Sequence, residues 1–171
     1  PATPSTPAKP AATPSATNPR PFGIETPPAK PAGTFRLATW NIENLYDDQD
    51  DPANSWPEEL ASTKPADHRK AAGEAIRTLD ADVLALEEVE SLDALQWFLR
   101  EQKLEGVYPY VVSLDAGDPR GIEQAVISRF PLSNARNWSD RSLGVESPPT
   151  LADGSANPDA GKPLMMARSP L

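Results

Sequence analysis

The sequence has no cysteine, so it can form neither a disulfide framework nor a thiolate metal site. It also lacks any apolar run that approaches the roughly 20 residues of a transmembrane helix. It begins without methionine and without a signal peptide, as a trimmed or partial sequence does. Because a Pro/Ala/Thr-rich segment ahead of a cysteine-free domain is common in exported proteins, we expect a secreted or periplasmic location.

Basic side chains are few: 16 Lys and Arg face 25 Asp and Glu, and the net charge is −9. Residues 1–34 carry three of the basic residues and only one acidic residue, Glu25, so the excess of acid lies after residue 34. A protein that binds a polyanion is usually basic, and here a bound cation would have to reverse the local charge. Net acidity alone also fits simple solubility.

Large apolar side chains are nearly missing from residues 1–34, which contain ten of the 21 prolines and only Phe22 and Ile24 as large apolar residues. Such a segment cannot bury enough surface to offset the entropy lost on ordering. We therefore predict a disordered Pro/Ala/Thr-rich linker over residues 1–34 and a folded domain over residues 35–171.

The hydrophobic pattern after residue 34 predicts alternating strands and helices, which indicates an α/β fold. We expect strands at residues 35–41, 82–88, 108–114 and 124–129, and helices at residues 68–79 and from Ser91 onward. Residues 47–67 and the segment from Ser139 onward read as polar loops.

The same pattern predicts which side chains are buried. The first helix would start at the N-cap Asp67 and bury Ala72, Ala75, Ile76 and Leu79. The second would bury Leu92, Leu95 and Leu99. The unbroken apolar run at residues 83–86 is typical of a strand covered on both faces.

Two of the predicted strands end in oxygen-bearing side chains, Asn41 and Glu43 on the first and Glu87 and Glu88 on the second. If these strands are parallel and joined by the helix between them, their carboxyl ends share one edge of the sheet. Carboxylate and amide oxygens without His or Cys suit a hard divalent cation. The alternative is that the two glutamates simply end a strand in solvent.

Three segments, TWNIEN, DVLALEEVE and RGIEQAVISRFPL, resemble in this order the endonuclease/exonuclease/phosphatase superfamily, the DNase I-like metal-dependent phosphoesterases. Members carry a strand ending in W-N-x, a strand D-[VI]-[LIV]-x-L-Q-E-V, and a later strand G-[IV]-[DE]-x-[AV]-[LIVF]-[LFY]-S-[RK]. The resemblance covers roughly residues 35–132.

Carried over residue by residue, the resemblance implies that Glu88 ligates the catalytic metal and that Asn41 lies beside it. Glu43 falls where many members keep an acidic residue near the same ion. Glu87 replaces the usual glutamine and adds a negative charge beside the metal ligand. Arg120 resembles an arginine placed near the substrate phosphate, although a solvated turn residue is the alternative.

The resemblance further implies a four-layer α-β-β-α sandwich and hydrolysis of a phosphate ester by an in-line water with a divalent cation, Mg²⁺ before Mn²⁺ or Ca²⁺. The family's G-D-x-N and S-D-H elements, which hold its Asp-Asn pair and its base histidine, occur nowhere in these 171 residues. His68, the only histidine, reads as a surface residue.

We therefore expect the chain to be truncated at its C-terminus, to supply only about half of the sandwich, and to be inactive by itself. Without the other half, one face of its sheet would be exposed. The side chains expected on that face are Val83, Leu84, Leu86, Val111, Val126 and Ile127.

The favoured function is that of a secreted nuclease acting on DNA or RNA. The alternatives are a lipid or inositol-phosphate phosphoesterase similar to sphingomyelinases, and a non-catalytic binding module on the same scaffold. The expected partner is accordingly a nucleic acid, or else a phospholipid or inositol phosphate, and a monomer is expected.

Overall fold

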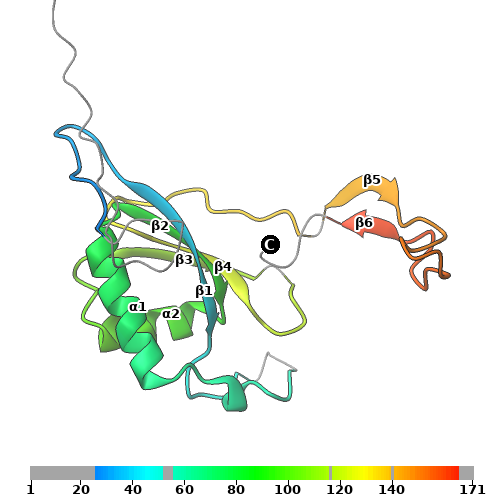
Figure 1. Ribbon diagram of the computed structural model, residues 1–171, viewed down its shortest axis with the longest axis horizontal. Helices are drawn as coiled ribbons and strands as arrows, with labels where there is room; N and C mark the ends of the chain where they lie inside the picture. The colour runs from blue at the N-terminus through cyan, green and yellow to red at the C-terminus, as the bar shows by residue number, and fades with distance from the viewer. Residues whose placement is uncertain (1–25, 52–55, 116, 140, 166–171) are drawn as a thin grey trace, which may run out of the picture.

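The computed structural model describes residues 26–51, 56–115, 117–139 and 141–165, so the predicted disorder of residues 1–25 lies outside the described part (Figure 1). The elements in chain order are strand β1 (Leu37–Leu45), the short 3-10 helix η1 (Leu60–Ser62), helix α1 (Ala66–Leu79), strand β2 (Val83–Val89), helix α2 (Leu92–Glu101), and strands β3 (Tyr110–Leu114), β4 (Glu123–Ser128), β5 (Ser142–Glu146) and β6 (Pro163–Met165).

The main sheet has four strands in the order β1-β2-β4-β3. β1 and β2 are parallel, with α1 in the connection between them, and the other neighbouring pairs are antiparallel. The predicted mixed α/β fold and the predicted parallel pairing are thus confirmed. Both helices lie on the same side of this sheet (Figure 1). Because β1 and β2 are parallel neighbours, their carboxyl ends meet at one edge.

The hydrophobic core fills the space between the sheet and the two helices. It is built from alternate strand residues such as Ile42, Leu84, Leu86 and Ile127, all of which have almost no exposed surface. The prediction that β2 is covered on both faces is wrong, because helices cover only one face and Val83 and Ala85 on the other remain partly exposed.

This burial also corrects the predicted exposed face. Leu84, Leu86 and Ile127 lie beneath the helices, while Val111 packs partly against the core. Of the six side chains expected on the exposed face, only Val83 and Val126 belong to the alternate set that faces away from the buried residues of their strands.

The first helix starts differently from the prediction. Pro65 is its N-cap, and Asp67 lies in the first turn and makes no capping bond. Ala75 is exposed, whereas Gly73 is buried. A Cβ at Gly73 would lie 2.7 Å from the side-chain Oε1 of Gln102, so this glycine allows the end of α2 to approach α1 closely.

The second helix follows the prediction at its start. The Ser91 hydroxyl accepts a hydrogen bond from the Ala94 amide at 3.1 Å, as an N-cap does. Leu95 and Leu99 are buried as expected, but Leu92 is exposed, and Phe98 takes the central place in the core. None of the helices in the described residues is long and apolar enough to cross a membrane.

The predicted loop after Ser139 contains a second, two-stranded sheet, β5 paired antiparallel with β6. This hairpin extends away from the main sheet (Figure 1), and its described side chains are exposed. The segment was predicted to be irregular because it contains many glycine and proline residues. One of these, Gly144, lies inside β5 with a positive φ of 74°. The described residues contain this hairpin and the main sheet, and no second layer of the expected four-layer sandwich.

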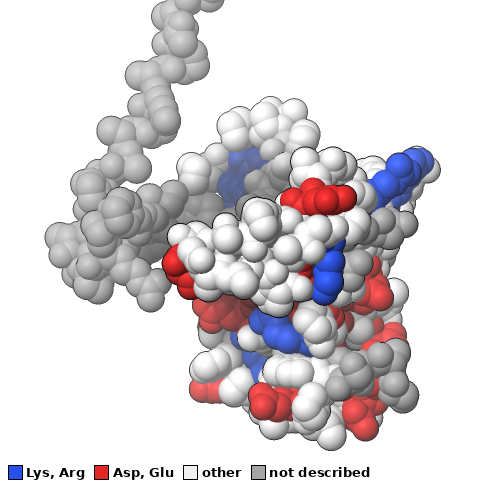
Figure 2. All heavy atoms as spheres, turned by 90° about the vertical axis from the view of Figure 1, so that its right-hand side faces the viewer, with Lys and Arg blue, Asp and Glu red and all other residues white. Residues whose placement is uncertain are grey.

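Acidic side chains are spread over the face seen in Figure 2, and the basic ones lie scattered among them, not gathered in one patch. This arrangement agrees with the net charge of −9. A polyanionic substrate that approached this face would meet repulsion unless a bound cation reversed the local charge.

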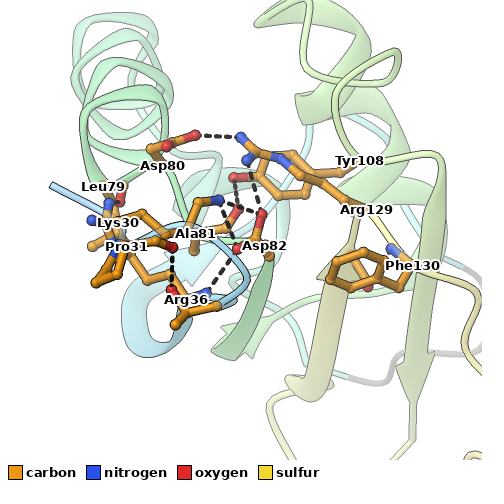
Figure 3. Close-up of polar contacts among 12 residues, drawn as sticks. Lys30, Pro31, Arg36, Leu79, Asp80, Ala81, Asp82, Tyr108, Arg129 and Phe130 are labelled. Atoms are coloured by element: carbon orange, nitrogen blue, oxygen red, sulfur yellow. Dashed lines mark hydrogen bonds and ion pairs between the residues drawn. The ribbon is translucent and has the colours of Figure 1, made fainter. Parts of the chain in front are cut away.

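A cluster of ion pairs around Asp82 closes the other end of the sheet, where β2 begins (Figure 3). Lys30 contacts both carboxylate oxygens of Asp82, at 2.6 and 2.7 Å, and Arg129 contacts one of them at 3.1 Å. The main-chain amide of Arg36 donates to the same carboxylate at 2.7 Å. The contacts of the folded domain therefore extend back to Lys30, before the predicted boundary at Phe35.

Candidate metal centre

The pairing between β1 and β2 is interrupted where the candidate site residues lie. Regular register ends at the pair Asn41 and Glu87, and pairing resumes at Leu45 and Val89. β1 thus continues past Asn41, where the sequence predicted its end. Three residues in the interrupted stretch have a positive φ: Glu43 at 60°, Asn44 at 56° and Glu88 at 63°.

A left-handed backbone is costly for residues other than glycine and often marks a functional site. These three left-handed residues belong to two neighbouring strands, whereas three others in the described part, Asp80, Lys103 and Asn134, lie elsewhere. The three on the strands together form one irregular patch at the carboxyl edge of the parallel pair, where α/β proteins commonly bind ligands.

The side chains of Asn41 and Glu88 meet at the same turn of the main chain. Asn41 Oδ1 accepts a hydrogen bond from the Glu43 amide at 2.8 Å, and Glu88 Oε2 accepts one from the Asn44 amide at 3.2 Å. Because these two amides are consecutive, the oxygens that they bind lie on one short piece of backbone.

The oxygens at this turn are carboxylate and amide oxygens, the kind that hard divalent cations prefer. Asn44 Oδ1 is buried and has no hydrogen-bond partner, and Glu43 lies at the surface next to it. Among the described residues no three acidic or histidine side chains form a ready metal-binding group. A cation here would be held by one or two carboxylates, an amide oxygen and water, as Mg²⁺ commonly is. The metal roles of Asn41, Glu43 and Glu88 remain predictions.

A buried lysine, which the sequence analysis missed, lies at the same place. Lys64 is 7% exposed, and its ammonium group donates to the Glu43 carbonyl at 2.9 Å. Burial lowers the pKa of Lys64, and the charges of Glu43 and Glu88 oppose that shift. A single lysine in a polar loop has no motif, so only the fold could reveal this contact.

Arg120 is held in its turn by Asp118, whose carboxylate accepts from the Arg120 amide at 2.9 Å and contacts its Nε at 3.2 Å. The hydroxyl of Tyr46 donates to the Arg120 carbonyl at 2.8 Å. Tyr46 is fully buried just after β1, and burial raises its pKa, so the hydroxyl keeps its proton. Tyr46 was not predicted as a site residue, and it connects the candidate site to the Arg120 turn.

The other two residues considered from the sequence lie elsewhere. Glu87 accepts a hydrogen bond from the Thr39 hydroxyl on β1. His68 is exposed on α1, as predicted for a surface histidine.

A second group of acidic residues surrounds the loop that follows β1. The Glu90 carboxylate accepts from the Asp47 amide at 2.8 Å, and the Glu59 carboxylate accepts from the Asp51 amide at 2.9 Å. Burial raises the pKa of Glu90 to about 8, and the neighbouring Glu59 carboxyl adds to the rise. Residues 47–67 were predicted to be a polar loop, and the burial of Glu59 was not predicted.

Comparison with known proteins adds one finding. A model of the Endonuclease/Exonuclease/phosphatase family matches residues 38–163, which include all four predicted site residues. No curated protein and no solved structure matches the chain.

Proposed function

This chain belongs to the endonuclease/exonuclease/phosphatase family, and from that premise we propose that it carries the metal-binding edge of a divalent-cation-dependent phosphodiester hydrolase. One observation carries the proposal. Asn41 and Glu88, on neighbouring parallel strands, present their oxygens to consecutive main-chain amides at a strained turn. Strain of this kind persists only where the surroundings enforce it, which suits a preorganised site.

In this proposal Asn41 and Glu88 hold the cation, Glu43 supports it from the surface, and Mg²⁺ is favoured over Mn²⁺ or Ca²⁺. A bound cation would supply charge neutralisation at the phosphoryl oxygens and at the leaving group. Lys64 restrains the turn through the Glu43 carbonyl. Arg120, restrained by Asp118 and Tyr46, would contact the substrate phosphate.

We propose no general base or general acid among the described residues. The family's G-D-x-N and S-D-H elements, which supply such groups, do not occur in the sequence. We therefore expect turnover from the complete gene product and none from the 171-residue chain by itself.

Nucleic acid is the favoured substrate, and a secreted or periplasmic location is proposed with it. A lipid or inositol-phosphate headgroup is the second candidate, because the same metal and arginine chemistry recognises any phosphodiester. A non-catalytic binding module on this scaffold is the third.

The test is hydrolysis by the complete gene product with Mg²⁺, measured on plasmid DNA, on RNA and on sphingomyelin vesicles. We expect cleavage of nucleic acid, and Glu88→Gln should lower kcat by about a hundredfold or more, because transition-state charge stabilisation of this kind is worth that much.

Glu87→Gln is the matched control, since it changes the adjacent carboxylate to the residue usual in the family and should keep activity within about threefold of wild type. Cleavage of vesicles alone would support the lipid candidate. The hydrolase proposal would be abandoned if Glu88→Gln cleaved as fast as wild type, or if no substrate were cleaved.

A further inference from the structure

Two buried carboxylates beside the candidate metal centre each have an oxygen without a partner. Glu59 is 2% exposed and Glu90 is 4% exposed. Glu59 Oε2 and Glu90 Oε1 are buried and make no hydrogen bond. An ionised carboxylate can only accept hydrogen bonds, so two carboxylates in one interior need either a cation or a proton beside them.

The other carboxylate oxygen of each glutamate accepts a hydrogen bond from the main chain, and these bonds hold both side chains in place. Glu90 Oε2 accepts from the Asp47 amide and Glu59 Oε1 accepts from the Asp51 amide. The two glutamates therefore clamp the loop that leaves β1 at two points. Each is oriented by the main chain, as the ligands of a preorganised cation site usually are.

A cavity of about 500 Å³ gives solvent access to Glu90, whereas the buried Glu59 is not one of its lining residues. Glu90 lines the cavity together with four aspartates and with the uncharged residues Gln49, Ser91 and Leu92. The lining contains no lysine or arginine. The aspartates are Asp47, Asp50, Asp51 and Asp93. A cavity with this lining attracts cations and can hold the water molecules of a partly hydrated ion.

We propose that Glu59 and Glu90 bind a second divalent cation, separate from the one predicted at Asn41 and Glu88. Two carboxylates with water completing the shell are a typical ligand set for Mg²⁺. No group of three or more acidic or histidine side chains in the described residues could hold a metal ion, so water would have to supply the other ligands. The cation joins the end of β2 to the loop after β1 and stabilises the edge on which the first site lies.

The competing explanation is a single proton shared by the two carboxyl groups. A shared proton would satisfy the same two oxygens but would not respond to Mg²⁺. Binding of the metal therefore separates the two explanations directly.

The experiment uses the 171-residue chain with Glu88→Gln, which removes the first predicted site, and titrates it with Mg²⁺ by isothermal calorimetry at neutral pH. We expect one Mg²⁺ per chain. Adding Glu59→Gln or Glu90→Gln should weaken this binding by at least about tenfold. Thermal unfolding gives the second readout: Mg²⁺ should raise the melting temperature of the Glu88→Gln chain and not that of the double variants.

Glu58→Gln is the matched control, because Glu58 neighbours Glu59 in the chain but is exposed. It should leave the Mg²⁺ affinity within about threefold of the Glu88→Gln chain. Should the Glu88→Gln chain bind no Mg²⁺ at millimolar concentration, or should Glu59→Gln and Glu58→Gln bind it equally well, the second site is overturned and the shared proton is supported. Circular dichroism of each variant confirms that it is folded.

Discussion

Glu43 has a positive φ, so substitutions at this position can measure the free-energy cost of the backbone conformation separately from any effect on metal affinity. Glu43 has a φ of 60°, its side chain is exposed, and its hydrogen bonds run through its own amide and carbonyl. Glycine can replace it without losing any of these contacts. The left-handed conformation costs a residue with a Cβ roughly 1–2 kcal/mol.

Glycine also makes the unfolded chain more flexible, which costs roughly 0.5–1 kcal/mol. The two terms leave Glu43→Gly as stable as wild type or more stable, by about 0–1.5 kcal/mol. Glu43→Val should be less stable than wild type by roughly 1–3 kcal/mol, because a β-branched residue fits this region poorly. Glu43→Gln keeps both the Cβ and the length, so its stability should be nearly unchanged.

The assay is urea unfolding with EDTA present, so that metal binding does not contribute to the free energy of unfolding. If Glu43→Gly were destabilised by more than about 1 kcal/mol while Glu43→Val was neutral, the strain argument would be refuted. Mg²⁺ titration of the same variants then tests the ligand role. If Glu43 contributes its carboxylate, both Glu43→Gly and Glu43→Gln weaken binding by a similar factor.

Three further predictions concern the parts of the fold that support the site. Hydrogen bonds from Lys30 and the Arg36 amide lower the pKa of Asp82 to about 2, so its contribution to stability is present above about pH 4 and is lost as the pH falls through 2. Urea unfolding at pH steps from 5 to 2 should therefore show a steeper loss for wild type than for Asp82→Asn, and parallel curves would contradict this. Tyr46→Phe removes the bond to the Arg120 carbonyl and should cost about 1 kcal/mol in the free energy of unfolding, whereas Tyr110→Phe, at an exposed tyrosine, should cost much less. Phe98→Ala, at a fully buried side chain, should cost about 3–5 kcal/mol, while Leu92→Ala on the same helix should cost under about 1 kcal/mol, and equal losses would show that the core is placed wrongly.

The sequence predicted the main sheet well because each strand has a clear pattern of apolar residues. The parallel pairing of β1 and β2 followed from the helix between them, and the second helix was predicted to start at Ser91, which the structure shows to be its N-cap. Errors arose where tertiary contact outweighs local preference. Ala75 fits a buried helical stripe, yet the close approach of Gln102 selects Gly73 for the buried position.

The candidate site was only partly predictable for the same physical reason. Asn41, Glu43, Glu88 and Arg120 lie in segments with a recognisable pattern. The contacts that Tyr46 and Lys64 make to Arg120 and Glu43 span 74 and 21 residues of sequence, and no local pattern signals them. Glu59 and Glu90 likewise become neighbours only because the loop after β1 folds back against β2, where each accepts from an amide of that loop.

The central claim, that Asn41 and Glu88 hold one cation together, is tested most directly by Mg²⁺ titration of the chain carrying Glu59→Gln, which removes the second proposed cation. Glu88→Gln and Asn41→Ala should each weaken the remaining binding by at least about tenfold, and Glu87→Gln should leave it within about threefold. Equal Mg²⁺ affinity with and without the Glu88 carboxylate would contradict the account.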